Sequence, residues 1–385
     1  MTLISLTLLG CAPGALSPDL VAPDLLDRGY VVSRDSNELF VVDTETLGSV
    51  GSLDTTVFPG RINGNHMAMV GMDGAKVYVS APEAGVVVVV EAASLTISGT
   101  IPVGRHATHA SVSPDGAQLW IVNEDDNTIS VIDTATDTVS RTLSDASLVV
   151  PHNVRFADTL AYVPSIGGNQ ITVFDRATYA VVDVIVAAGT ELGACAGDPC
   201  GFADAQIDPD GVLFASHIET GTVLVYDTVA SERLADVGVG LQPWSAFVDP
   251  FGDTPGMAMV PTWTDTAVAR VDVAGERIMS GAGDQEVYGV NFSPLAPTEA
   301  FVLNRVRHEV AVIDRATGEA TARIDVGGTT ETGTTAMNGM ILLPISSTGE
   351  LLVLDPASGD IVARHAGVGS YPWSVATAAG QNYCH

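Results

Sequence analysis

Three histidines recur at equal intervals, because His109 follows His66 by 43 residues and His152 follows His109 by 43 residues. Neutral imidazole is a good ligand for Cu(II) and Zn(II), and three imidazoles with an open fourth position describe a reactive site as well as a storage site. His106, in the segment just before His109, is a fourth candidate ligand. The sequence therefore predicts a copper or zinc site, provided that the fold brings these histidines together.

The repeat that would position the histidines runs through the whole chain. Eight short apolar segments each end in an acidic residue, and most of these residues are about 42 positions apart. They are Asp43, Glu91, Asp133, Asp175, Asp227, Asp272, Asp314 and Asp355. A period near 42 residues with about four short strands is typical of a β-propeller blade. We therefore expect an all-β fold, an eight-bladed β-propeller of four-stranded antiparallel blades.

The two ends of the chain indicate how the ring closes. Only two predicted strands, residues 30–33 and 39–42, come before Asp43, so the first blade lacks its innermost strand. The C-terminal segment 372–376 is apolar and is left without a blade of its own. We expect this segment to complete the first blade, because a shared blade leaves no sheet edge exposed.

The innermost strands line the central channel, so the residues at their starts lie at the channel mouth. Histidines occupy this place in three successive blades, and Trp244, Tyr288 and Trp373 occupy it in others. Loops between the second and third strands should open on the same face. They add four candidate ligand-binding residues: His217, Arg305, Arg307 and His308. The arginines could clamp a carboxylate or phosphate, or could pair with acids on the protein's own surface.

One feature of the repeat opposes the metal site. Alignment on the Asp–Gly turns puts His109 one residue out of phase with His66 and His152, and one residue along a strand means the opposite face. Two other hypotheses therefore stay open. The histidines could form a polar channel mouth that hydrogen-bonds to backbone groups without metal, or the mouth could hold an organic or haem-like ligand.

The segments TISVIDTATDTV at 128–139, TIPVG at 100–104 and SPDG at 113–116 resemble the YVTN repeats of extracytoplasmic β-propellers. The resemblance covers about residues 28 to 380 and implies the propeller fold, but it implies little about function because the motif reports turns and packing. More distant relatives of this class include the haem-binding propellers of dissimilatory nitrite reductases. A seven-bladed relative class holds copper with histidines. The resemblance therefore keeps copper and a haem-like group as candidate cofactors.

Charge limits the choice of partners. The chain has 46 acidic and 16 basic residues and a net charge of −30, which excludes a phosphate backbone as a partner and opposes docking on anionic lipid. The chain also lacks the Gly-x-Ser-x-Gly, His-Glu-x-x-His and phosphate-loop motifs. We expect a monomer that binds a small molecule or a protein at the channel mouth and has no nucleic-acid partner.

The N-terminal segment predicts export. Residues 1–10 are apolar, and Leu8-Leu9-Gly10-Cys11 resembles the bacterial lipobox, so residues 1–11 are expected to be a signal segment with lipidation at Cys11. Residues 12–26 are expected to be a tether and residues 27–385 a single propeller domain. The lipid would then be the only membrane attachment of a periplasmic or cell-surface bacterial lipoprotein, such as one anchored in the outer membrane.

The cysteines agree with that location. Cys195 and Cys200 enclose a turn-like spacer and are expected to form a disulfide, which fits an oxidising compartment. We therefore expect an exported, membrane-tethered propeller that binds a ligand or partner at its channel mouth and is not a catalyst. The alternative is a periplasmic redox enzyme, or a cofactor-handling protein, with copper or a haem-like group at the mouth.

Overall fold

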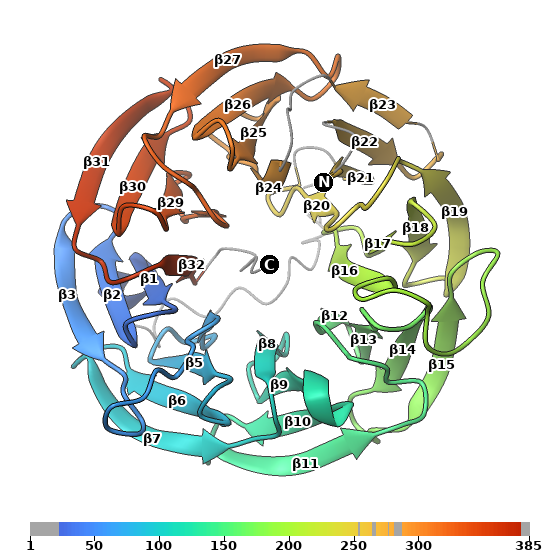
Figure 1. Cartoon of the computed structure of the whole chain (residues 1–385), viewed down its shortest axis with the longest axis horizontal. Helices are drawn as coiled ribbons and strands as arrows, with labels where there is room; N and C mark the ends of the chain where they lie inside the picture. Colours follow the sequence, from blue (N-terminus) through green and yellow to red (C-terminus); the bar gives the residue numbers. More distant parts are fainter. Residues whose placement is uncertain (1–22, 253–254, 264–266, 276, 281–286, 379–385) are drawn as a thin grey trace, which may run out of the picture.

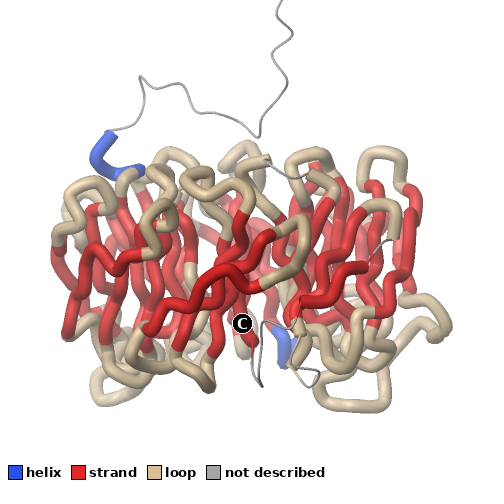
Figure 2. Tube along the Cα trace, turned by 90° about the horizontal axis from the view of Figure 1, so that it is seen from above, coloured by secondary structure: helices blue, strands red, loops and turns tan. Residues whose placement is uncertain are grey.

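The computed structural model describes residues 23–378 apart from 253–254, 264–266, 276 and 281–286. Eight four-stranded antiparallel sheets follow one another in a ring around a central axis (Figure 1). Seen from the edge, the strands run across the thickness of a disc and the loops lie on its two faces (Figure 2). The eight-bladed propeller expected from the sequence is confirmed.

Each blade runs from an innermost strand beside the channel to an outermost strand at the rim (Figure 1). In this order, blade 1 is β32 (Pro372–Thr377), β1 (Arg28–Ser33), β2 (Glu38–Asp43) and β3 (Ser49–Asp54). Blade 2 is β4 (Ala68–Val70), β5 (Lys76–Ala81), β6 (Val86–Glu91) and β7 (Thr96–Pro102). Blade 3 is β8 (Ala107–Val112), β9 (Gln118–Asn123), β10 (Thr128–Asp133) and β11 (Thr138–Ser144). Blade 4 is β12 (Arg155–Ala157), β13 (Leu160–Pro164), β14 (Gln170–Asp175) and β15 (Val181–Val186).

The second half of the ring repeats the same order. Blade 5 is β16 (Phe202–Ile207), β17 (Val212–His217), β18 (Thr222–Asp227) and β19 (Glu232–Gly238). Blade 6 is β20 (Phe247–Val248), β21 (Met257–Pro261), β22 (Val268–Asp272) and β23 (Arg277–Ser280). Blade 7 is β24 (Val287–Asn291), β25 (Glu299–Asn304), β26 (Glu309–Asp314) and β27 (Ala320–Asp325). Blade 8 is β28 (Thr334–Thr335), β29 (Ile341–Ile345), β30 (Glu350–Asp355) and β31 (Asp360–Ala366).

The acidic residue of each repeat ends the third strand of its blade, as the sequence predicts. In seven of the eight blades this residue is an aspartate whose carboxylate accepts a backbone hydrogen bond from the turn to the outermost strand. In blade 3, Oδ1 of Asp133 accepts hydrogen bonds from the backbone N–H groups of Ala135 at 3.0 Å and Thr136 at 2.9 Å. These hydrogen bonds lower the pKa of Asp133, because they stabilise its charged form. A short carboxylate at this position therefore fixes the strand end.

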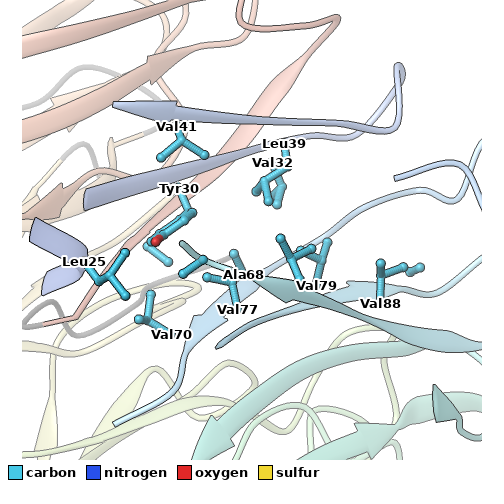
Figure 3. Packing of buried hydrophobic residues seen from close by; sticks show 14 of the residues in the cluster. Leu25, Tyr30, Val32, Leu39, Val41, Ala68, Val70, Val77, Val79 and Val88 are labelled. Atoms are coloured by element: carbon cyan, nitrogen blue, oxygen red, sulfur yellow. The ribbon is translucent and has the colours of Figure 1, made fainter. Parts of the chain in front are cut away.

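The core lies between the blades rather than within one of them. Figure 3 shows Tyr30 and Val41 of blade 1 on one side of such an interface, with Ala68, Val77 and Val79 of blade 2 on the other. The second and third strands are buried on both faces because a neighbouring blade packs on each side. This packing accounts for their continuous apolar sequences.

The N-terminal end of the described chain also contributes to this core. Helix α1 (Pro23–Leu26) precedes β1, and its Leu25 packs in the interface between blades 1 and 2. Packing of the propeller thus begins within the segment that the sequence assigned to the tether. Besides α1, the described residues contain one short 3-10 helix, η1 (Glu124–Asp126), and no helix among them is long and apolar enough to span a membrane. Cys11 and Cys384 lie outside the described residues.

Strand β32 closes the ring, which confirms the prediction from the chain ends. It pairs antiparallel with β1, with Tyr30 opposite Ala376. Its side chains enter three different hydrophobic clusters: Trp373 packs with blades 2 and 3, Val375 with blade 8, and Ala376 between blades 1 and 2. The last strand of the chain therefore joins blade 1 to its neighbours on both sides.

The disulfide is also confirmed. Cys195 and Cys200 are bonded in the loop between β15 and β16, where the sequence places an insertion between the fourth and fifth blades. The loop is attached to the β13–β14 connection of blade 4, since the N–H of Cys195 donates to Gly167 O at 3.1 Å and that of Cys200 donates to Ile166 O at 3.2 Å.

Candidate metal centre at the channel mouth

The three spaced histidines lie at the starts of the innermost strands of blades 2, 3 and 4. His66 and His152 come just before β4 and β12, and each is held by the second strand of its own blade. The N–H of His66 donates to Ser80 O at 3.1 Å, and the N–H of His152 donates to Pro164 O at 2.9 Å. The two residues are therefore equivalent in their blades, as the spacing predicts.

His109 lies in a β-bulge at the start of β8. Ala107 pairs with Asn123 and Ala110 pairs with Ile121, so one more residue lies on β8 than on β9 between these two pairs. An extra residue in a bulge returns the following side chains to the other face of the strand. The pairing in blade 4 shifts in the same way between Pro151–Ser165 and Arg155–Tyr162, so the bulge does not distinguish His109 from His152. The ring contacts show that His109 nevertheless lies beside His66 and His152.

The imidazoles form a continuous cluster. Nε2 of His66 lies 3.2 Å from Nε2 of His109, and the ring centroids of His109 and His152 are 4.3 Å apart. The side chains of His109 and His152 are almost completely buried, whereas His66 is partly exposed. His106 joins the cluster through an acidic neighbour. All four predicted metal ligands therefore lie in one region.

That neighbour is Glu124, at the start of η1. Its Oε2 lies 3.2 Å from Nδ1 of His106, and its Oε1 lies 3.6 Å from Nδ1 of His109. Ligand atoms of His109, Glu124 and His152 all lie within 4.8 Å of one another. Sequence reasoning did not identify Glu124 as part of the metal site, because its approach depends on how β9 ends against β8.

Backbone and side-chain acceptors orient the rings. Nδ1 of His152 contacts the carbonyl oxygen of Ala203, and Nδ1 of His109 lies 3.1 Å from Oγ1 of Thr108. A ring whose Nδ1–H donates to such an oxygen presents Nε2 as its free ligand atom, and this tautomer is the usual one in metal sites. The surroundings therefore favour coordination through the Nε2 atoms.

The charges of the cluster suit a cation. Enclosure of His66, helped by the neighbouring His109, lowers the pKa of His66 well below its ordinary value, so its imidazole is neutral at neutral pH. Burial alone would raise the pKa of Glu124, but hydrogen bonds from His106 and His109 outweigh this and hold its pKa far below the usual range. Hydrogen bonding to Glu124 raises the pKa of His106. Neutral imidazole beside an ionised carboxylate is what a divalent metal requires.

Aromatic side chains occupy the mouth next to His152. Trp244 precedes β20 and Trp263 follows β21, and their rings are parallel, with centroids 4.6 Å apart and an interplanar angle of 8°. The rings of His152 and Trp244 are nearly perpendicular, with their centroids 6.3 Å apart. Tyr288 of β24 continues the series at 5.8 Å from Trp263. The sequence predicted Trp244 and Tyr288 here, and Trp263 belongs to a loop that the repeat places on the same face.

The series continues through blades 7, 8 and 1. The guanidinium of Arg305 lies over the Tyr288 ring, 4.7 Å from its centroid, and pairs with the fully buried Glu331 at 3.2 Å. Burial and the neighbouring Glu331 raise the pKa of Tyr371. The ring of Tyr371 stacks on that of Trp373, with the ring centroids 5.9 Å apart. Trp373 in turn lies 5.7 Å from His66. Contacts between side chains therefore run around the whole mouth.

One predicted residue, His217, is placed elsewhere, and two others lie on an exposed loop. His217 does not open on the mouth, because its side chain is fully buried against Phe202 and hydrogen-bonded to Asn169. Arg307 and His308 are exposed on the β25–β26 loop, and His308 contacts Thr329 at 3.4 Å. Of the Arg305–His308 segment, the contacts of Arg305 place it at the mouth.

Comparisons with known proteins support the fold. No protein-family model matches the chain, and no curated protein matches it. Among solved structures, the dihydro-haem d1 dehydrogenase NirN in complex with DHE is 16% identical, with a TM-score of 0.74 over 96% of this chain and 80% of that chain. AztD from Citrobacter koseri in its apo form is 13% identical, with a TM-score of 0.63 over 90% of this chain and 96% of that chain.

A third structure is more distant. Hydrazine synthase from Kuenenia stuttgartiensis is 17% identical, with a TM-score of 0.58 over 80% of this chain and 99% of that chain. At these identities the comparisons establish the propeller fold and do not assign a ligand or a reaction.

Proposed function

We propose that this protein is an exported propeller that binds a divalent transition metal, Cu(II) or Zn(II), at its channel mouth through His66, His109 and His152. The observation that carries the proposal is the 3.2 Å separation of Nε2 of His66 and Nε2 of His109. Metal–imidazole bonds of about 2.0–2.1 Å at tetrahedral angles place neighbouring ligand atoms about 3.3 Å apart. The two nitrogen atoms are therefore already spaced as two ligands of one metal.

Two protonated imidazoles at this distance would repel each other, so the pair is stable only when at least one ring is neutral. His152 supplies a third ring in contact with His109. Three nitrogen ligands from three rigid strands leave one coordination position open, which is the arrangement of sites that bind a further ligand. Imidazole donors select Zn(II) and Cu(II) over Mg(II) and Ca(II), which prefer oxygen ligands.

Glu124 has a supporting role in this proposal. Its carboxylate faces the Nδ1 atoms of His106 and His109 and supplies a negative charge beside the imidazoles. A carboxylate that accepts from a ligating histidine fixes the ring and raises its basicity, and loss of such a partner weakens metal binding by about 10- to 100-fold. His106 would act through Glu124 and would not be a direct ligand.

One further observation supports a location outside the cytoplasm, and one comparison supports ligand binding by this fold. The Cys195–Cys200 disulfide suits an oxidising compartment, and oxidised copper is available there. The NirN structure holds a ligand on a similar fold. Lipidation at Cys11, which lies outside the described residues, and anchoring at the outer membrane complete the proposal.

The test is isothermal titration calorimetry with Zn(II) and Cu(II) on the metal-free protein. His66→Ala and His152→Ala should each weaken binding by more than about 100-fold, the upper range found for loss of a supporting partner alone. His365→Ala on β31, which lies on the outer strand beside Phe40, is the matched control and should bind as the wild type does. Absence of binding, or equal binding by the His66→Ala/His152→Ala double variant, would show the proposal to be wrong.

A further inference from the structure

The described chain has an unusual distribution of tryptophan around the metal cluster. Three of its four tryptophans, Trp244, Trp263 and Trp373, lie in the series of rings at the mouth, and Trp120 alone lies in the core between blades 3 and 4. One aromatic ring borders the histidines on each side: Trp244 meets His152, and Trp373 meets His66. Aromatic rings therefore border the histidine cluster on both sides.

Two hydrogen-bond donors in this group have no acceptor. Within the described part of the chain, the indole Nε1 atoms of Trp244 and Trp263 are buried and make no hydrogen bond. Buried donors are nearly always satisfied, so two adjacent unsatisfied ones require an explanation. A ligand that presents oxygen acceptors to the mouth would satisfy them.

A cation stands on the other side of the histidines. Arg34, in the loop after β1, is exposed, and its guanidinium lies over the Trp373 ring, 5.2 Å from the centroid. Among the described residues it forms no ion pair, although the chain has 46 acidic residues against 16 basic ones. Its charge also acts on His66. An exposed, unpaired arginine on an aromatic face beside a metal cluster suits an anionic group.

We infer that the channel mouth binds a planar aromatic anion with oxygen donors, of the catecholate or salicylate class, next to the metal. Its ring would pack against the aromatic side chains beside the histidines, and its oxygen atoms would meet the indole N–H groups and the open metal position. The positive charge of Arg34 would attract the anion from the other side of the histidines. This inference rests on the proposed metal site for the contact with the metal only. The aromatic contacts and the attraction by Arg34 belong to this chain's own residues.

The chemistry of the occupant follows from the lining. An aliphatic anion would gain the attraction of the guanidinium but would lose the favourable contact between aromatic rings. An aromatic cation would be repelled by Arg34 and by a bound metal ion. Ring, negative charge and oxygen donors are therefore required together, and this requirement can be tested with small probes.

The experiment titrates salicylate into the metal-free and the Zn(II)-loaded full-length protein and follows tryptophan fluorescence, with calorimetry as a second readout. Zn(II) is used because it does not exchange electrons with the probe. Salicylate should bind the Zn(II)-loaded protein at least about tenfold more tightly than the metal-free protein, as expected for one added charge-assisted contact. Cyclohexanecarboxylate and benzylamine should bind at least about tenfold more weakly than salicylate.

Variants separate the contacts. Trp244→Leu/Trp263→Leu should weaken salicylate binding about tenfold, and Trp244→Phe/Trp263→Phe, which keeps two aromatic faces, should recover most of the loss. Arg34→Gln should weaken it about tenfold, whereas Arg364→Gln, an exposed arginine on β31 paired with Glu350, should have no effect. Unchanged melting temperatures show that the variants are folded.

The possible results distinguish the two proposals. Zn(II) binding without salicylate binding, or salicylate binding that is equal in the leucine and Arg34→Gln variants, overturns this inference and leaves the metal site standing. Salicylate binding to the metal-free protein that depends on the tryptophans and Arg34, with no Zn(II) binding, supports the aromatic site and refutes the metal site.

Discussion

Protonation of His217 should couple the stability of the propeller to pH. The residue ends β17, and its side chain has no exposed surface. Its Nδ1 accepts a hydrogen bond from the backbone N–H of Thr220 at 3.3 Å, so the proton of the neutral ring is on Nε2, which lies 3.1 Å from Oδ1 of Asn169. Burial lowers the pKa of His217 to about 4, because the charged ring would be poorly solvated.

The sign and the size of this pH dependence follow from the difference between the pKa of His217 in the folded state and in the unfolded state. In the unfolded chain the pKa of histidine is about 6.5, so between pH 6.5 and 4 the unfolded state binds more protons and stability falls as pH falls. The free energy of unfolding falls by about 3 kcal/mol in total once the pH is below 4. Between pH 7.5 and pH 5.0 the loss attributable to His217 is about 2 kcal/mol.

The assay compares urea unfolding of the wild type and His217→Gln at pH 7.5 and pH 5.0. Glutamine can accept a hydrogen bond from Thr220 and donate one to Asn169, but it does not titrate. The free energy of unfolding of the wild type should therefore fall by about 2 kcal/mol more than that of the variant between pH 7.5 and pH 5.0. The exposed His308→Gln is the control and should follow the wild type. An equal loss in the wild type and His217→Gln would refute the buried, neutral state assigned to this histidine.

Four further predictions concern closure, the disulfide, export and the metal. Deletion of residues 371–385 removes β32, exposes the edge of β1 and takes one buried side chain from each of three hydrophobic clusters. Cooperative unfolding in calorimetry should therefore be lost. A truncated chain that melts like the full one would contradict the shared blade. Replacing Cys195 and Cys200 by serine should lower the free energy of unfolding by about 2 kcal/mol in urea titration, and an unchanged midpoint would contradict this. The exported protein should incorporate a fatty-acid analogue in a bacterial host and Cys11→Ser should not; an unlabelled wild type would refute lipidation. Zn(II) affinity measured by calorimetry should fall as pH drops below about 6, because protons compete with the metal for the imidazoles. The lowered pKa of His66 should leave measurable binding at pH 5.5. An affinity independent of pH would argue against imidazole ligands.

Much of the architecture was predictable from the sequence, because each repeat encodes its own turns. The acidic residue at the end of each third strand is a local signal, since its carboxylate bonds to backbone groups two and three residues ahead. Eight such signals predicted eight blades, and the unmatched segment 372–376 predicted the closing strand. The Cys195–Cys200 pair was equally local. Regular spacing also brought His66 and His152 to equivalent places, because a repeated blade repeats its innermost strand.

Tertiary structure decided whether the histidines could act together. The sequence showed His109 one residue out of phase, and only the packed structure shows that its ring nevertheless contacts those of His66 and His152. The approach of Glu124 to His106 and His109, and of Glu331 to Arg305, joins residues whose loops meet only after the blades have packed. Burial of His217 likewise depends on the neighbouring blade, since Asn169 comes from the β13–β14 connection. Local patterns in the sequence specify strands and turns, whereas the contacts between blades determine which side chains share the mouth.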